Sequence, residues 1–169
     1  MKYDNLNQFK DSFSGYTELR VQENRNNRVS LTNGDVTGNV ASTISGVSSR
    51  VFKDGNWGFS SSPDINQDSI ANVVNASIDN VRFMNKKDTT RCGLFLPETQ
   101  ANYEMNFTTK KDRQNQKFWL DFVKEVDGYI EKKYPELLSR NLVLGGLDME
   151  KSLFTSDGSE SYSMTPRAH

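Results

Sequence analysis

The chain has 169 residues, of which 34% are hydrophobic, and a formal net charge of −1 at pH 7. This length fits one domain, or one domain with an appendage. The near-neutral charge argues against a binder of nucleic acid or of anionic membranes, because both classes usually carry a basic excess. No apolar run approaches the ~18 residues of a membrane span, and the start lacks the apolar core of a signal peptide. Cys92 is the single cysteine, so no internal disulfide is possible and a cytoplasmic location is expected.

A short helix followed by a series of strands is predicted at the start of the chain. Leu6, Phe9 and Phe13 form one apolar helical face. Alternating polar and apolar residues then predict five strands, at residues 17–21, 28–32, 36–44, 46–53 and 56–61. Turns are predicted at residues 24–27, at Asn33-Gly34 and at Asp54-Gly55, because these residue types suit turns and positive backbone angles. The pattern predicts an antiparallel meander with one apolar face.

The clearest predicted helix covers Asp64–Asn85. Asp64 can cap its start, and Gln67 three residues later completes a capping box. A stripe at helical spacing consists of Ile70, Val73, Val74, Ser77, Val81 and Met84. Because this face needs an apolar partner and the meander offers one, residues 1–86 are predicted to form an α/β unit of two layers.

The rest of the chain is predicted to be a long connection followed by a helix and strands. Residues 87–110 show no sustained period and are expected to be the connection. A helix is predicted over residues 111–133, with Trp119, Phe122, Val123, Val126 and Ile130 on its apolar face. Strands at residues 142–154 and 161–164 flank a turn at Ser156–Gly158 and complete a region of residues 111–169. The expected fold class is α+β, a meander packed against long helices in two layers.

Three residues of the predicted hairpin are candidate contacts for a peptide or a protein partner: Arg50, Trp57 and Phe59. The two aromatic residues fit either the wall of a peptide channel or core packing beneath the helix. Core packing is the favoured interpretation, because Gly58 after Trp57 permits close approach. Arg50 fits either a ligand for a substrate carboxylate or a solvated strand arginine, and the second is favoured.

Other chemically reactive residues do not form a convincing site. Cys92 has no histidine near it in sequence, so an inert thiol is expected. Asp148 and Glu150 lie on one face of a predicted strand. Paired carboxylates can perform acid–base or metal chemistry, but an exposed acidic face is the favoured interpretation. No catalytic residue and no metal ligand is therefore predicted in this chain.

Several motifs occur in an order typical of one family. They are Thr17-Glu18-Leu19-Arg20-Val21, the Asn33-Gly34 turn, the Arg50–Phe59 hairpin with its helix, and the late Ser156–Gly158 turn. Together they resemble the N-terminal domain of the TldD/PmbA zinc metallopeptidases, the modulator of DNA gyrase family. The resemblance is densest over residues 16–84.

The resemblance implies an intracellular peptidase, acting as a homodimer or paralogue heterodimer on peptides or unfolded segments. It also implies zinc held by a His-Glu-x-x-x-His helix that lies C-terminal to the region seen here. This chain has one histidine, His169, so it cannot form that motif, and no catalytic residue is carried over.

We therefore expect the non-catalytic N-terminal domain of such an enzyme, as part of a longer protein or as a shortened paralogue. It would contribute a dimer surface and a wall of the peptide chamber, with an exposed strand edge that pairs with an extended peptide. The alternative is a stand-alone peptide- or protein-binding regulatory module derived from that family. A third hypothesis is an unrelated α+β domain that binds carbohydrate or protein.

Overall fold

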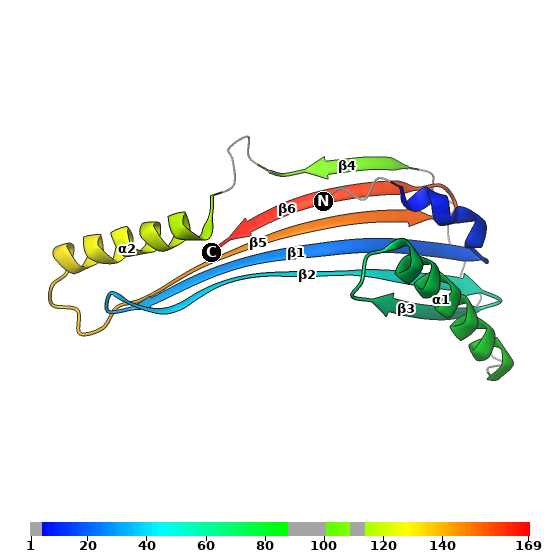
Figure 1. Ribbon diagram of the computed structural model, residues 1–169, viewed down its shortest axis with the longest axis horizontal. Helices are drawn as coiled ribbons and strands as arrows, with labels where there is room; N and C mark the ends of the chain where they lie inside the picture. The colour runs from blue at the N-terminus through cyan, green and yellow to red at the C-terminus, as the bar shows by residue number, and fades with distance from the viewer. Residues whose placement is uncertain (1–4, 88–100, 109–113) are drawn as a thin grey trace. The chain divides into compact units, whose positions relative to one another are not determined.

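The protein is a mixed α+β fold built on one six-stranded sheet, described here from a computed structural model that covers residues 5–87, 101–108 and 114–169 (Figure 1). The order of the strands is β3-β2-β1-β5-β6-β4. In chain order the elements are η1 (Leu6–Ser12), β1 (Tyr16–Thr32), β2 (Asp35–Lys53), β3 (Asn56–Ser62), α1 (Gln67–Lys87), β4 (Asn102–Asn106), α2 (Gln116–Lys133), β5 (Asn141–Thr155) and β6 (Glu160–Ala168). The predicted α+β class is confirmed.

The tight turns are those that the sequence predicts. Asn33 and Gly34 have φ of 52° and 87°, and Asp54 and Gly55 have φ of 52° and 89°. Two successive positive φ angles are the geometry of the two-residue turn that matches the twist of a β-hairpin. Gly158, with φ of 90°, lies in the turn between β5 and β6. Each of these turns joins two strands that are consecutive in the sequence and adjacent in the sheet.

The predicted turn at residues 24–27 is wrong. The structure has a single 17-residue strand, β1, where two strands were predicted, and a single 19-residue strand, β2, where the third and fourth were predicted. The meander therefore has three strands. Asparagine is poor in isolated strands, but backbone pairing on both sides of a central strand overrides this weak preference. The sheet order places β1 between β2 and β5.

The connection predicted over residues 87–110 contains a strand of its own. β4 pairs with β6 in parallel, with Asn102 opposite Glu160 and Asn106 opposite Met164. In Figure 1, β4 lies beside β6 at the edge of the sheet. Cys92 lies outside the described residues.

The chain divides into two compact units. The first consists of residues 1–23, 44–106 and 150–164, and the second of residues 24–43, 107–149 and 165–169. The regions predicted from the sequence, by contrast, are continuous stretches of chain. Both units are discontinuous because each long strand contributes one part to the first unit and another part to the second. Within the described parts of the chain, no helix is long and apolar enough to cross a membrane.

The first unit has its core between α1 and the sheet. The predicted stripe of α1 is buried except at its end, since Ile70, Val74 and Val81 are fully covered while Met84 is 41% exposed. The stripe packs with Leu19, Val21, Val47 and Val51 of the strands and with Leu6 and Phe9 of η1. A buried pair, Ser49 and Ser77, joins β2 to α1 by a hydrogen bond of 2.8 Å between the hydroxyls. The helix thus has one fixed position on its strands.

The start of α1 differs from the prediction. The capping side chain is Asn66, whose Oδ1 accepts a hydrogen bond of 2.8 Å from the backbone N–H of Ser69. Asp64 does not cap the helix, because the helix begins at Gln67 and the capping residue must directly precede it.

In the second unit, α2 covers Val29 and Leu31 of β1 with Val123, Trp119 and Leu120. Its N-terminal cap is Asn115, and it ends at Lys133, before Pro135, as predicted. The predicted apolar face is only partly covered. Phe122, assigned to that face, is 47% exposed, and Phe118 and Tyr129 are also exposed.

A buried ion pair fixes the segment after α2. The Arg140 Nε donates to Asp127 Oδ1 at 3.0 Å, and Arg140 Nη2 donates to Glu131 Oε1 at 3.1 Å. The hydrogen bond with Asp127 is the main reason that the pKa of Arg140 lies above its usual value. The backbone of Arg140 also exchanges hydrogen bonds with Asn33 in the β1–β2 turn, at 2.7 and 2.9 Å. These contacts fasten the start of β5 to that turn.

Gly58 of β3 should be the position at which the first unit tolerates a side chain least. A Cβ there would lie 2.1 Å from the carbonyl oxygen of Ser77 and 2.6 Å from the backbone nitrogen of Val81. Because both atoms belong to the backbone of α1, neither can move aside alone. We expect Gly58→Ala to lower the free energy of unfolding by about 3 kcal/mol or more, at the upper end of overpacking effects, in urea titrations.

Gly128 offers a matched control, since a Cβ there meets nothing within 4 Å. Gly128→Ala lies in the interior of α2 and should stabilise by roughly 0.5–1 kcal/mol. Equal effects of the two substitutions would contradict the close approach of α1 to β3.

Candidate functional site

The hairpin of β2 and β3 brings the three predicted contact residues to one face of the sheet. Arg50 lies opposite Phe59, and Phe52 lies opposite Trp57. Successive side chains of a strand point to opposite faces, and Val51 and Gly58 are buried on the face that meets α1. Arg50, Trp57 and Phe59 therefore lie on the other face, called here the open face of the first unit.

The prediction that Trp57 and Phe59 pack beneath the helix is wrong. Phe59 is 58% exposed, and Trp57 is half-buried among residues of the open face. The residue of β3 that packs closely against the backbone of α1 is Gly58 itself. The pleat of the strand then directs both of its neighbours away from the helix.

Arg50 and Trp57 form the centre of an aromatic cluster with Phe52, Tyr16 and Glu18. The guanidinium carbon of Arg50 lies 4.6 Å from the centre of the Trp57 ring. The Phe52 and Tyr16 ring centres lie 5.0 and 6.3 Å from that of Trp57. Arg50 Nε and Nη2 each donate a hydrogen bond of 2.9 Å to the carboxylate of Glu18.

Arg50 remains a solvated strand arginine, as the favoured interpretation has it, since its side chain is 52% exposed. Its guanidinium also pairs with Glu18 and stacks on Trp57. An arginine stacked on an aromatic ring and held by a bidentate carboxylate loses much of its rotational freedom. The cluster is therefore a preorganised, partly apolar platform.

Tyr16 shows the electrostatic character of the platform. Its pKa is raised to about 12, first because burial disfavours the phenolate and next because Glu18 repels negative charge. Tyr16 and Glu18 were not predicted as site residues. The signal was present, since the alternation that places Arg50 and Phe52 on one face of β2 does the same for Tyr16 and Glu18 on β1.

The outer edge of β3 carries main-chain groups of the same residues. Lys53 pairs with Asn56 directly across the two-residue turn, and such a flanking pair exchanges hydrogen bonds within the hairpin. Alternation then directs the N–H and C=O groups of Trp57, Phe59 and Ser61 away from β2. Consistent with this, Asn80 Nδ2 of α1 donates a hydrogen bond of 2.8 Å to the Phe59 carbonyl oxygen. Since β3 is an edge strand, the main chain and the aromatic side chains are presented together.

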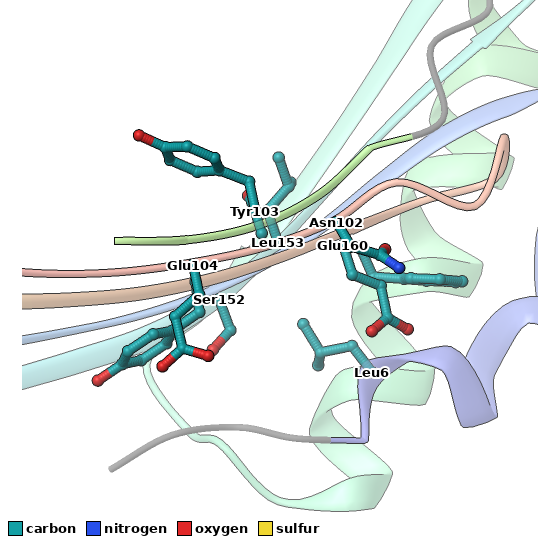
Figure 2. Close-up of a pocket in the computed structure, with 10 residues that line it drawn as sticks. Leu6, Asn102, Tyr103, Glu104, Ser152, Leu153 and Glu160 are labelled. Atoms are coloured by element: carbon teal, nitrogen blue, oxygen red, sulfur yellow. The ribbon is translucent and has the colours of Figure 1, made fainter. Parts of the chain in front are cut away.

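A second candidate is a pocket of about 450 Å³ in the first unit, shown in Figure 2. Glu104 of β4 and Ser152 of β5 lie on the side of the strands that faces Leu6, whereas Tyr103 points away from it. Beside it, Tyr162 Oη donates a hydrogen bond of 2.9 Å to Glu150 Oε1, and Glu150 is 5% exposed. The predicted exposed acidic face is thus wrong at Glu150. Asp148 belongs to the second unit.

The described residues do not suit a zinc site. They contain no group of three or more histidine, cysteine, aspartate or glutamate side chains that could hold a metal ion. His169 lies against Gly145 at the end of β6, where the two backbones exchange hydrogen bonds of 2.7 and 2.9 Å. A structural or catalytic zinc site needs at least three protein ligands, so no metal ligand is assigned among the described residues.

Comparison with known families finds a match over residues 17–81, to the model described as PmbA/TldA metallopeptidase domain 1. These residues include β1, β2, β3 and most of α1, and so the whole aromatic cluster except Tyr16. No curated protein matches the chain by sequence.

Solved structures share the fold. TldE from Thermococcus kodakarensis superposes with a TM-score of 0.64 at 14% identity, over 98% of this chain and 37% of that one. A candidate modulator of DNA gyrase from Bacteroides thetaiotaomicron gives 0.66 at 14% identity, over 95% and 37%. One from Thermotoga maritima gives 0.58 at 12% identity, over 90% and 34%. This chain thus spans little more than a third of the length of the proteins it resembles.

The raised pKa of Tyr16 predicts a specific loss of stability in alkali. Below pH 10 the phenol is protonated in both the folded and unfolded states. Between about 10 and 12 the unfolded chain ionises while the folded chain does not, so the free energy of unfolding falls as the pH rises through this window. We expect Tyr16→Phe to flatten this part of the stability curve, measured by urea unfolding from pH 9 to 12.

Tyr129→Phe is the control, because Tyr129 is 59% exposed on α2. Glu18→Gln should lower the pKa of Tyr16, followed by phenolate absorbance, without returning it to 10, since burial remains. A stability curve that Tyr16→Phe leaves unchanged in shape would contradict this assignment.

Proposed function

We propose that this chain is the non-catalytic N-terminal part of a TldD/PmbA-like zinc metallopeptidase that cleaves peptides or unfolded segments. The match of residues 17–81 to PmbA/TldA metallopeptidase domain 1 supports this proposal. Zinc and the catalytic residues would be supplied by further sequence of a full-length member, where zinc activates water for amide hydrolysis. A cytoplasmic location is part of the proposal and is supported by the single cysteine. A stand-alone peptide-binding or regulatory module is the alternative.

One observation supports the proposed role in peptide binding: the residues of β3 whose main-chain groups point outward are also those whose side chains lie on the open face. An extended peptide that adds to the edge of β3 would pair with the backbone of Trp57, Phe59 and Ser61. Its side chains on the open face would then contact Phe59 and the aromatic cluster. Main-chain pairing of this kind tolerates many sequences, while neighbouring side chains add selectivity.

The proposal includes a dimer, formed with a second copy or with a paralogue. The exposed aromatic side of α2 supports it. Phe118 and Phe122 are 50% and 47% exposed, and their rings stack at 6.5 Å with an interplanar angle of 10°. Large aromatic residues are enriched at protein interfaces, so this side of α2 is the proposed dimer surface.

The two tryptophans of the chain, Trp57 and Trp119, allow peptide binding to be located by NMR. Each indole N–H gives one signal in a ¹⁵N-labelled sample, and Trp57→Phe and Trp119→Phe assign them. A capped ten-residue peptide of alternating threonine and valine, with a lysine at each end, should shift the Trp57 signal in a saturable manner. Phe59→Ser should weaken binding about five- to tenfold, or about 1–1.4 kcal/mol, because the peptide loses an apolar contact.

Phe83→Ser is the matched control, since Phe83 is 55% exposed on α1 and should leave the affinity unchanged. Absence of a saturable Trp57 shift would overturn the peptide-binding role. Zinc-dependent, chelator-sensitive peptide hydrolysis by this chain alone would overturn the non-catalytic role.

Asn80 should hinder the addition of a peptide strand to the edge of β3. Its carboxamide occupies the Phe59 carbonyl oxygen, an acceptor that an added strand needs. Asn80→Ala should therefore increase the affinity for the same peptide, by about two- to tenfold for a net hydrogen bond of ~0.5–1.5 kcal/mol. Asn75→Ala, at an exposed asparagine of the same helix, is the control. Weaker or unchanged binding by Asn80→Ala would show that peptides do not use this edge.

A further inference from the structure

The segment Asn24-Arg25-Asn26-Asn27 is unusual, because it lies in the interior of β1. Asparagine is depleted in strands, since its side chain competes for backbone hydrogen bonds and favours turns. The residues of this segment are half-buried. A β-branched residue would suit the strand better. Such disagreement between local preference and fold is expected where residues serve binding rather than stability.

Three of these four residues line a pocket of about 420 Å³ in the second unit. Its lining includes Arg25, Asn26 and Asn27 of β1, Ser42 of β2, Trp119 of α2 and Asp148 of β5. The three strands are neighbours in the order β2-β1-β5, so the lining residues form a row across the sheet. Because side chains alternate along β1, Arg25 and Asn27 share the face of Val29 and Leu31, on which Trp119 packs. The volume lies within the range of small-ligand sites. The pocket is separate from the aromatic cluster, which belongs to the first unit.

The aromatic wall of this pocket is held in place. A Cβ on Gly146 would lie 2.7 Å from Cη2 of Trp119, so the ring rests directly on the backbone of β5. Trp119 also packs against the Val29, Leu31 and Val123 cluster. Near it, Gln116 Nε2 donates a hydrogen bond of 2.7 Å to Asn39 Oδ1 of β2. The indole is therefore preorganised, which lowers the entropic cost of binding against it.

The chemistry of the lining favours an uncharged, polar ligand. Arg25 and Asp148 contribute one charge of each sign, so the pocket attracts neither anions nor cations strongly. The carboxamide of Asn27 offers both donors and an acceptor, which complement the N–H and C=O of a peptide group. Trp119 adds an apolar surface for a side chain.

We propose that this pocket binds an uncharged polar segment of an extended peptide, with Asn27 contacting its main chain and Trp119 one of its side chains. This inference rests on the proposed function, because it assigns a second peptide subsite to the same protein. It adds a preference for neutral polar sequence, which the edge of β3 does not impose.

The test uses the whole ¹⁵N-labelled chain and a capped, uncharged ten-residue peptide of serine, asparagine, glutamine and glycine. The Trp119 indole signal should shift in a saturable manner. Asn27→Val should weaken this binding at least tenfold. The same substitution should leave the melting temperature unchanged or raise it, because valine prefers strands. A residue with a merely structural role would not combine lost binding with retained or increased stability.

Thr37→Val is the matched control, since Thr37 is an exposed residue of β2 in the same unit, outside the pocket lining, and should bind normally. The proposal would be overturned if the Trp119 signal did not shift, or if Asn27→Val bound the peptide as well as the unchanged protein. Preferential binding of cellohexaose would also overturn it and would assign the pocket to carbohydrate.

The two peptide-binding proposals can fail separately. If the threonine–valine peptide shifts the Trp57 signal while the polar peptide leaves the Trp119 signal unmoved, only the pocket proposal fails. If Trp119 responds and Trp57 does not, only the β3 edge proposal fails.

Discussion

The close approach of α1 to β3 at Gly58 is the constraint on which the first unit depends. With no side chain at this position, the helix backbone comes so near that a Cβ would lie 2.1 Å from a carbonyl oxygen. The apolar stripe of α1 can then reach the buried valines of β2 and the Ser49 hydroxyl. Because side chains alternate along a strand, turning Gly58 toward the helix turns Trp57 and Phe59 away from it. One packing requirement thus creates both the core and the open face.

The same alternation joins two properties that a peptide-binding edge needs. Residues whose backbone groups point outward from β3 are also those whose side chains lie on the open face. Arg50 contacts both Glu18 and Trp57 there, so a paired charge and an aromatic surface lie side by side on the open face. Asn80 covers one acceptor of the edge, and natural proteins commonly protect edge strands in this manner against unwanted pairing.

In the second unit, most residues that stabilise the fold are separate from those that line the polar pocket, and Trp119 belongs to both sets. Val29 and Leu31 with α2 supply apolar burial, and the Asp127–Arg140 pair with Asn33 fastens the β1–β2 turn to β5. Breaking a buried pair of this kind leaves an uncompensated charge, so the turn and the start of β5 are tied together. Residues 24–27 can be polar because backbone pairing with the neighbouring strands β2 and β5 keeps them in the sheet, without burial of apolar side chains of their own.

The sequence by itself determined the local features of this protein: the hairpin turns at Asn33-Gly34 and Asp54-Gly55, the stripe of α1, the end of α2 before Pro135, and the similarity of residues 17–81 to PmbA/TldA metallopeptidase domain 1. These depend on short-range backbone preferences and on periodicity, which are readable from consecutive residues. Only the tertiary structure decided that residues 24–27 continue a strand and that β4 joins β6. It also decided that Asn66 caps α1, that Trp57 and Phe59 face away from α1, and that Arg50 is held by Glu18. Each of these outcomes depends on a partner distant in the sequence, and such contacts override local preference because burial and ladder hydrogen bonds are shared across the whole sheet.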